Sequence, residues 1–214
     1  MAVRLVMMGA PGAGKGTQAE RVAREHGVPR VSTGDILREA VQAGSPLGKA
    51  AKAVMASGAL VSDDVVIGIV RDRLARPDAA KGFVLDGFPR TVVQAEALDE
   101  SLDHAAPLVV VDIEVPTEVL VSRLSSRRIC ASCGWLATPG ATVCEKCGGK
   151  LVQRPDDTAD VVRERLRVYE RDTQPLVEFY RRRETFRAVD GDQTPEGVAR
   201  DIAAAIASVL GAKR

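Results

Sequence analysis

The chain has 214 residues, long enough to bury one substantial core, and its 30 lysine and arginine residues nearly balance 29 acidic residues. A formal net charge of +1 and an aromatic content of 3% argue against a nucleic-acid-binding protein, which needs a basic surface and rings for base stacking. No apolar run reaches the roughly 18 residues of a membrane span, and residues 1–4 lead into an apolar stretch without a signal-peptide pattern. We therefore expect a cytoplasmic protein that binds neither nucleic acid nor membrane.

The amino-terminal pattern predicts a strand over residues 3–8 and a helix over residues 15–26, joined by a glycine-rich loop at residues 9–17. The glycines of this loop allow successive backbone N–H groups to point at one anion. The helix adds its positive N-terminal end, Lys15 a mobile charge, and Thr17 or its neighbour a hydroxyl for Mg²⁺. We interpret the loop as a phosphate cradle; the alternative is a glycine-rich turn with an incidental lysine.

Residues 33–76 hold three expected helices and no clear strand. Gly44 and Gly58 separate the helices, and the third ends before Pro77. This stretch is therefore predicted to be a helical insertion in a chain that otherwise alternates strands with helices.

The remaining expected elements alternate in type. Strands are expected at residues 28–32, 82–86, 107–113 and 186–190, and helices at residues 91–102, 116–128, 158–183 and from 194 onward. Pro175 should kink or break the third of these helices. The alternation predicts an α/β fold: a doubly wound, parallel, five-stranded sheet of the P-loop NTPase type, with ligands beyond the carboxyl ends of the strands. The phosphate loop and Asp86 both fall at that edge.

Arginines recur beside these stretches at positions 38, 90, 123, 127, 154 and 163. Arg123 and Arg127 would lie four residues apart on one helix face, where like charges repel unless an anion lies between them. Forked guanidinium groups suit phosphoryl transfer, which depends on positioning and charge neutralisation. The alternative for any single arginine is a place on a solvated basic face.

All four cysteines, Cys130, Cys133, Cys144 and Cys147, fall in two Cys-x2-Cys pairs separated by ten residues. Four thiolates with this spacing make a closed tetrahedral zinc site, which is structural because no position is left for water. A disulfide framework would need an oxidising compartment, and a thioredoxin-like role would need only one pair. The segment 128–160 is too poor in apolar residues to fold unaided, so we expect zinc to supply its folding energy.

Taken together, these motifs resemble the adenylate kinases. The resemblance rests on residues 9–17, 32–38 and 86–90 with Gln94, on Arg123 with Arg127 and Arg128, and on Asp156 and Asp157 ahead of Arg163. The resemblance spans nearly the whole chain, and within the family the chain is similar to the long bacterial type, which has a lid insertion. The resemblance implies reversible, Mg²⁺-dependent phosphoryl transfer from ATP to AMP giving two ADP, in a monomer whose lid excludes water and carries a structural Zn²⁺.

The resemblance also implies two neighbouring nucleotide sites. The ATP site would be formed by Gly12, Ala13, Gly14, Lys15, Gly16, Thr17, Arg123, Arg127 and Gln193. The AMP site would be formed by Thr33, Arg38, Leu60, Val61, Gly87, Arg90, Gln94, Arg154 and Arg163. The residues acting on the transferred group would be Lys15, Asp86, Arg90, Arg127, Arg154 and Arg163.

Two of these assignments have alternatives. Asp86 would hold the water shell of Mg²⁺, or would cap the next turn. Gln94 would bind the adenine edge, or would complete a capping box with Thr91, or would do both. No general base is required, because the acceptor is a phosphate oxygen that is already ionised at neutral pH.

Three domains follow from the resemblance: a core of residues 1–32, 59–125 and 161–214, an AMP-binding flap of residues 33–62 with helices extending to 76, and a zinc-binding lid of residues 126–160. Two other functions stay open at this point. One is a kinase for UMP, CMP or GMP, against which Thr33 and Gln94 favour AMP. The other is a zinc-ribbon nucleic-acid-binding protein with an accessory nucleotide site.

Overall fold

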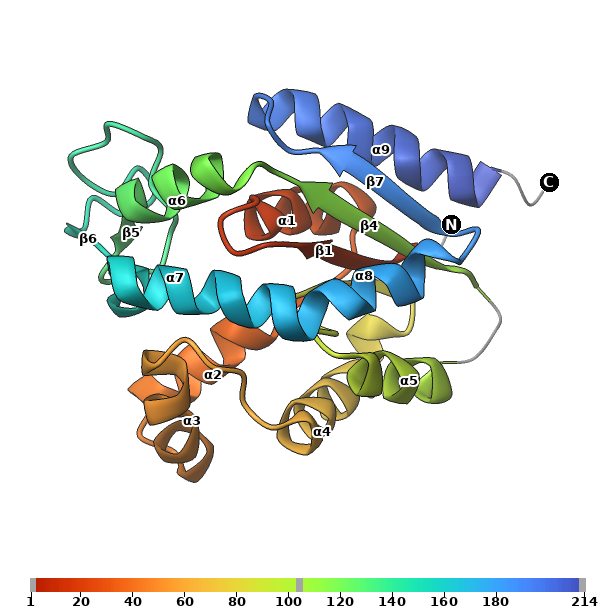
Figure 1. The fold of residues 1–214 in the computed structure, drawn as a ribbon, viewed down its shortest axis with the longest axis horizontal. Helices are drawn as coiled ribbons and strands as arrows, with labels where there is room; N and C mark the ends of the chain where they lie inside the picture. Colours follow the sequence, from red (N-terminus) through yellow and green to blue (C-terminus); the bar gives the residue numbers. More distant parts are fainter. Residues whose placement is uncertain (1–2, 103–105, 212–214) are drawn as a thin grey trace.

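The computed structural model describes residues 3–102 and 106–211, built around a parallel sheet of five strands in the order β2-β3-β1-β4-β7. The strands are β1 (Val3–Gly9), β2 (Arg30–Ser32), β3 (Gly82–Asp86), β4 (Leu108–Glu114) and β7 (Phe186–Asp190). Figure 1 shows β1 and β4 at the centre of the molecule, with helices in front of and behind them. The predicted α/β fold with a parallel five-stranded sheet is confirmed.

Each face of the sheet packs against its own set of helices, and this explains the uninterrupted apolar strands. Leu5 and Val109 face α1 (Lys15–His26) and α9 (Pro195–Gly211) in one buried cluster. Val6 and Val110 face α4 (Asp63–Leu74), α5 (Val92–Ser101) and α8 (Gln174–Arg181) in the other cluster. Because adjacent strand residues point to opposite faces, both sets must be apolar.

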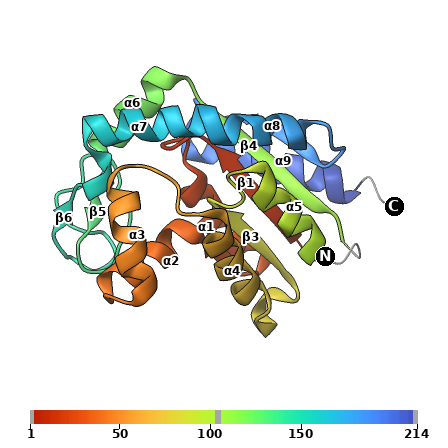
Figure 2. The same ribbon diagram turned by 60° about the horizontal axis from the view of Figure 1, so that its bottom comes forward.

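The helical insertion comprises α2 (Thr33–Gln42), α3 (Pro46–Ala56) and α4, followed by the short η1 (Pro77–Ala79). No strand occurs in this stretch, all of which the structure describes. The hydroxyl of Ser45 caps α3 by accepting a hydrogen bond from the Gly48 backbone at 3.1 Å. A Cβ at Gly48 would lie 2.0 Å from the Ala40 carbonyl oxygen, so glycine allows α2 and α3 to pack closely. Figure 2 shows these two helices side by side.

The cysteine-containing segment begins where α6 (Thr117–Ser126) ends. The expected helix over 116–128 is wrong at its end, because Arg127 is already extended, with φ −61° and ψ 133°. The chain then forms the antiparallel pair β5 (Ile129–Cys130) and β6 (Leu151–Val152) and the turn η2 (Pro155–Asp157). Arg127 therefore leaves the helix face that it was expected to share with Arg123.

The long helical stretch after residue 158 is interrupted without losing its direction. It consists of α7 (Ala159–Val168), the wide π-type turn η3 (Tyr169–Thr173) and α8, and Figure 1 shows the three as one continuous rod. The backbone N–H of Gln174 donates to the carbonyl of Tyr169, five residues earlier. Pro175 was expected to kink or break the helix. The wide turn accommodates this residue in the first turn of α8 instead.

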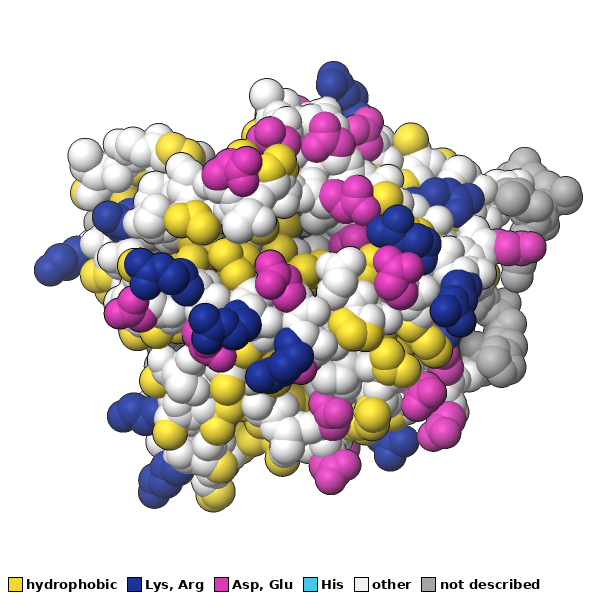
Figure 3. All heavy atoms as spheres, viewed as in Figure 1, with side chains coloured by type: hydrophobic (Ala, Val, Ile, Leu, Met, Phe, Trp, Pro, Cys, Tyr) yellow, Lys and Arg dark blue, Asp and Glu magenta, His cyan; other side chains and the backbone are white. Residues whose placement is uncertain are grey.

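Charge on the visible surface is mixed. Figure 3 shows lysine and arginine side chains interspersed with acidic ones over this face, as the near-zero net charge predicts. Among the residues that the structure describes, no helix is both long enough and apolar enough to cross a bilayer.

Candidate active site

The loop between β1 and α1 has the geometry of an anion cradle. Gly9, Gly12 and Gly14 all have positive φ values, of 134°, 89° and 95°. A Cβ at Gly9 would lie 2.7 Å from the Ile113 carbonyl oxygen, so this turn requires glycine. The described first turn of α1 carries no acidic side chain that would compete for its N–H groups. The backbone therefore offers an open, positively polarised site at the carboxyl end of β1.

The ammonium of Lys15 lies inside this loop. It donates hydrogen bonds to the carbonyl oxygens of Gly9 at 2.7 Å and Ala10 at 2.9 Å. Burial lowers the pKa of Lys15 to about 8; Asp86 partly offsets this effect and Arg90 adds to it. A phosphate at the loop would stabilise the charged form of this side chain.

Asp86 ends β3 beside the phosphate loop and is only 7% exposed. Arg30, which the sequence analysis did not identify as a site residue, donates to Asp86 Oδ2 from Nη2 at 2.5 Å and from Nε at 3.2 Å. A Cβ at Gly16 would lie 3.5 Å from the same oxygen. The carboxylate thus faces the phosphate loop, where Mg²⁺ is typically bound by a carboxylate together with substrate phosphates. Its hydrogen bonds to Arg30 account for its burial without the alternative capping role.

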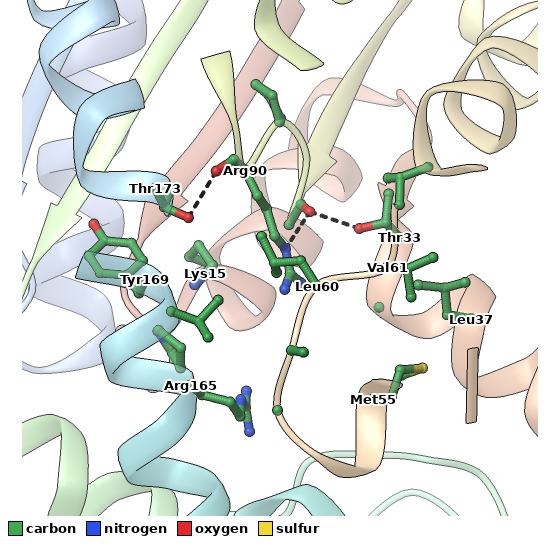
Figure 4. Close-up of a pocket in the computed structure, with 18 of the residues that line it drawn as sticks. Lys15, Thr33, Leu37, Met55, Leu60, Val61, Arg90, Arg165, Tyr169 and Thr173 are labelled. Atoms are coloured by element: carbon green, nitrogen blue, oxygen red, sulfur yellow. Dashed lines mark hydrogen bonds between the residues drawn. The ribbon is translucent and has the colours of Figure 1, made fainter. Parts of the chain in front are cut away.

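A cleft extends from Lys15 toward the helical insertion. Figure 4 shows Lys15, Arg90 and Arg165 at one end and Leu37, Met55 and Val61 at the other. Of the predicted site residues, the cleft brings together Lys15, Thr33, Arg38, Leu60, Val61, Gly87, Arg90 and Gln94. One end is therefore cationic and the other is largely apolar.

Arg90 is held in place by three segments of the chain. Its Nε donates to the Gly87 carbonyl oxygen at 2.8 Å, and Thr33 Oγ1 donates to the same oxygen at 2.8 Å. Thr173 Oγ1 donates to the Arg90 carbonyl at 3.0 Å. Gly87 has a φ of 78°, a left-handed conformation that favours glycine, and a Cβ there would come within 2.9 Å of Arg90 Nη2. These contacts pre-organise Arg90 before any ligand binds.

The arginines near the cleft repel one another. Burial, and then the charge of Arg165, lowers the pKa of Arg90 to about 10. Burial, and then the charges of Arg38 and Arg127, lowers the pKa of Arg154 to about 10. The Nε of Arg154 is buried without a partner among the described residues. An anion bound among these side chains would relieve both the repulsion and the missing hydrogen bond.

Arg163 does not join this group. Its side chain is 71% exposed and pairs with Asp160 at 2.6 Å on the outer face of α7. Arg165 lines the cleft instead, and its Nη1 lies 3.1 Å from Asp156 and 3.0 Å from Asp157. Two residues along a helix turn a side chain by about 200°. The buried Val162 on the same helix was the signal that could have separated the two arginines.

Arg123 and Arg127 point to different partners. Arg123 Nη2 donates to the Gly191 carbonyl at 2.9 Å, close to the predicted Gln193. The Nε of Arg127 donates to Oδ2 of the fully buried Asp157 at 2.7 Å. Gln193 itself donates to Asp201 at 2.8 Å. Neither arginine lines the cleft, and Thr17 is exposed at the start of α1.

The cysteines satisfy the geometry of a zinc site. Their four Sγ atoms all lie within 4.8 Å of one another. The separations are 3.5 Å for Cys130–Cys147, 3.6 Å for Cys133–Cys144 and 3.4 Å for Cys133–Cys147. Tetrahedral Zn–S bonds of about 2.3 Å place sulfurs about 3.8 Å apart, so the donor set fits Zn²⁺ with little adjustment.

The fold and the cleft define a P-loop phosphotransferase, in which partly buried arginines line the same cleft as the lysine of the phosphate loop. The sequence model of the adenylate kinases matches residues 7–185. The chain is 49% identical over 215 residues to the adenylate kinase of Archaeoglobus fulgidus, covering 97% of this chain and 99% of that protein. It is 51% identical over 207 residues to the adenylate kinase of Gloeobacter violaceus, covering 91% and 94%. The chain belongs to the adenylate kinase family.

Family membership confirms several predictions. The reaction is phosphoryl transfer from ATP to AMP giving two ADP, with Mg²⁺ accompanying ATP, and the substrates are ATP, AMP and ADP. The four-cysteine cluster fits the structural zinc of the long bacterial type. A kinase for another monophosphate and a zinc-ribbon nucleic-acid-binding protein are not favoured.

Proposed function

We propose that the two nucleotides of the adenylate kinase reaction occupy opposite ends of one arginine-lined region. ATP lays its phosphates on loop residues 12–17, with Lys15 on the outer phosphates. Arg123 lies against the adenine of ATP, Gln193 also binds this nucleotide, and Arg127 lies near the transferred phosphoryl group. The N-terminus of α1, whose first turn carries no acidic side chain, and the contact of Arg123 with Gly191 support this arrangement.

AMP occupies the other end, against the helical insertion. Its phosphate binds Arg38, Arg90 and Arg154, and its base enters the apolar part of the cleft. The residues proposed around the nucleoside are Thr33, Leu60, Val61, Gly87 and Gln94. Their support is that all five line the cleft together.

The observation that carries the proposal is the set of partly buried guanidinium groups near Lys15. Arg90 and Arg165 line the same cleft as Lys15, and burial, followed by charge repulsion from Arg165, lowers the pKa of Arg90. Phosphoryl transfer spreads negative charge over the equatorial oxygens of the transferred group, and fixed cations stabilise that charge. We therefore assign Arg165, together with Lys15, Arg90, Arg127 and Arg154, to the transferred group, and we leave Arg163 out.

Asp86 is proposed to orient the hydrated Mg²⁺ that accompanies ATP. When bound, Mg²⁺ neutralises phosphate charge and orients the oxygens for in-line transfer. The contribution of the protein is a carboxylate held rigidly by Arg30 and directed at the phosphate loop.

The proposed domains are a core of residues 1–32, 59–125 and 161–214, a flap of residues 33–62 over AMP, and a lid of residues 126–160. The lid carries the cysteine cluster, the two-residue strands β5 and β6 and the short turn η2, so bound zinc would hold it together. Closure of the lid excludes water, which would otherwise accept the phosphoryl group.

A cytoplasmic location and a monomeric state complete the proposal. Four cysteines placed as metal ligands, and not as disulfides, suit a reducing compartment. The monomeric state rests on the family alone and is tested by light scattering.

The experiment that tests the nucleotide assignment measures ADP formation from ATP with AMP, UMP, CMP or GMP as acceptor. AMP is expected to be preferred by a large factor. An equal rate with a pyrimidine monophosphate would contradict the assignment of the apolar end to adenine.

A further inference from the structure

Gln94 lies at the wall of the cleft with both atoms of its side-chain amide already bonded. Its Oε1 accepts a hydrogen bond from the Arg90 backbone N–H at 2.8 Å. Its Nε2 donates to Asp63 Oδ1 at 2.7 Å. The residue is 1% exposed, so no water competes freely for these bonds. The capping box expected with Thr91 is half formed: Thr91 Oγ1 accepts from the Gln94 N–H at 3.2 Å, but the return bond goes to Arg90.

The two partners leave the amide one orientation. A backbone N–H can only donate and an ionised carboxylate can only accept. Rotating the amide of Gln94 by 180° would bring its NH₂ against the Arg90 N–H and its carbonyl against the Asp63 carboxylate. Both bonds would be lost, and each buried partner would face a like group.

Asp63 is itself held in place. Its Oδ2 accepts from Thr91 Oγ1 at 3.1 Å, and the residue begins α4 directly after Ser62. Thr91, Gln94 and Asp63 therefore form a closed ring of hydrogen bonds that ties the start of α4 to the start of α5. Because the carboxylate of Asp63 is fixed in this way, it holds the hydrogen-bond acceptor for the Gln94 amide in one position.

We propose that Asp63 is a specificity-positioning residue, which makes the acceptor site select a 6-aminopurine by locking the amide of Gln94. The inference rests on the proposed function, in which the base of AMP reaches Gln94. The locked amide retains one N–H and one lone pair for the ligand. Adenine offers an amino donor at position 6 and a ring-nitrogen acceptor beside it, whereas a 6-oxopurine reverses both groups. A freely rotating glutamine would bind either base by turning over, and the lock prevents this.

The test compares AMP with inosine monophosphate, which differs from AMP only at position 6 and at the protonation of the adjacent nitrogen. Asp63→Asn replaces the carboxylate by an amide that presents either a donor or an acceptor. We expect the AMP-to-IMP ratio of kcat/KM to fall on the order of tenfold, because one bidentate base contact is no longer selective. The change should appear mainly in KM for the acceptor, with KM for ATP unchanged.

Asp64→Asn is the matched control. Asp64 is the next residue of the same helical turn and is exposed, so its replacement removes the same charge from the start of α4 without touching Gln94. The AMP-to-IMP ratio of this variant should equal that of the unmodified enzyme. A ratio that is unchanged in Asp63→Asn, or that falls equally in both variants, overturns the lock.

Two further measurements separate the possible failures. Gln94→Leu tests the proposed function directly: an unchanged KM for AMP would show that the base does not reach this residue. A raised KM for AMP in Gln94→Leu, with an unchanged ratio in Asp63→Asn, would reject the lock alone. If Asp63→Asn does not fold, nuclear magnetic resonance of the unmodified enzyme decides. The lock requires one Gln94 side-chain N–H proton to be shifted and protected by the carboxylate, and a freely exchanging NH₂ would overturn it.

Discussion

Replacing Arg165 by methionine should remove most phosphoryl transfer, whereas the same substitution at Arg163 should leave it intact. The two residues lie on opposite faces of α7. Both variants therefore change the same helix by the loss of one arginine and one positive charge, and differ only in the face that is affected. Arg165 lines the cleft with Lys15, whereas Arg163 is 71% exposed. A comparison of the two variants therefore tests whether the position of the arginine relative to the transferred phosphoryl group determines its effect on activity.

The structure also separates the stability cost from the catalytic cost. Arg165 loses its bonds to Asp156 and Asp157, but Arg127 still holds Asp157 through Nε at 2.7 Å. Losing a hydrogen bond to a charged group costs about 1.5–3 kcal/mol, which lowers Tm by roughly 2–4 °C per kcal/mol in a chain of this size. A positioned arginine on a transferred phosphoryl group contributes about 10³-fold or more to kcat. At Arg163 only an exposed pair worth about 0.2–0.5 kcal/mol disappears.

The assay is coupled ADP formation at saturating ATP and AMP, with calorimetric Tm on the same samples. We expect kcat to fall about 10³-fold in Arg165→Met and to stay within about twofold in Arg163→Met. If Arg165→Met retains more than a tenth of the activity while folded, or if both variants lose activity alike, the assignment of Arg165 is wrong.

Three further predictions concern other parts of the molecule. Burial lowers the pKa of Lys15 to about 8, so ATP affinity measured by calorimetry should fall as the pH rises above 8. In Lys15→Arg this pH dependence should disappear. An affinity that does not change with pH in the unmodified enzyme would contradict the prediction. The stability of the fold changes with pH in the opposite direction. Below pH 8 the charged Lys15 destabilises the folded state by a constant amount, and this destabilisation disappears as the pH rises toward 10.5, the pKa in the unfolded chain. Chelation of zinc should unfold residues 126–160 alone and abolish activity, while the main calorimetric transition persists. Unfolding of this segment should change the fluorescence of Trp135, the one tryptophan of the chain. Unchanged fluorescence and activity would reject the prediction. Arg30→Gln should lower Tm, because the buried Asp86 loses its ion pair at a cost of about 1–3 kcal/mol in the free energy of unfolding. The same variant should need less Mg²⁺ for half-maximal binding of ATP. An unchanged Tm together with an unchanged Mg²⁺ requirement would show that the Arg30 contact is incidental.

Elements with strong local signals were predictable from the sequence. The helix expected at residues 15–26 has those bounds, because the glycine loop leads directly into it and Gly27 ends it with φ 64°. The strand expected at residues 82–86 also has those bounds, since all five of its residues are buried. In both cases the ends depend on the residues inside or next to the element, so a single sequence contains the needed information.

The end of α6 and the π-type turn were not predictable in the same way. Nothing in the residues around 126 stops a helix, and the extended backbone of Arg127 coincides with its ion pair to Asp157, thirty residues later. Pro175 signals a disturbance of the helix, but a wide turn and a sharp kink both satisfy its missing N–H. Packing of α8 against α5 and the sheet favours the arrangement that keeps the rod straight.

Polar partners were the least accessible part of the site, and Arg30 shows why. Asp86 was recognised as a site residue from its motif, but its ion pair depends on which residue of β2 lies beside it. The strand β2 has three residues, and its register with β3 places Ser32 opposite Asp86 and Arg30 opposite Val84. So short a strand carries too little apolar pattern to specify a register, and a slip of one residue would turn Arg30 to the other face of the sheet. Motifs therefore indicated candidate site residues such as Lys15 and Asp86, whereas the residues that orient them depended on contacts between distant segments.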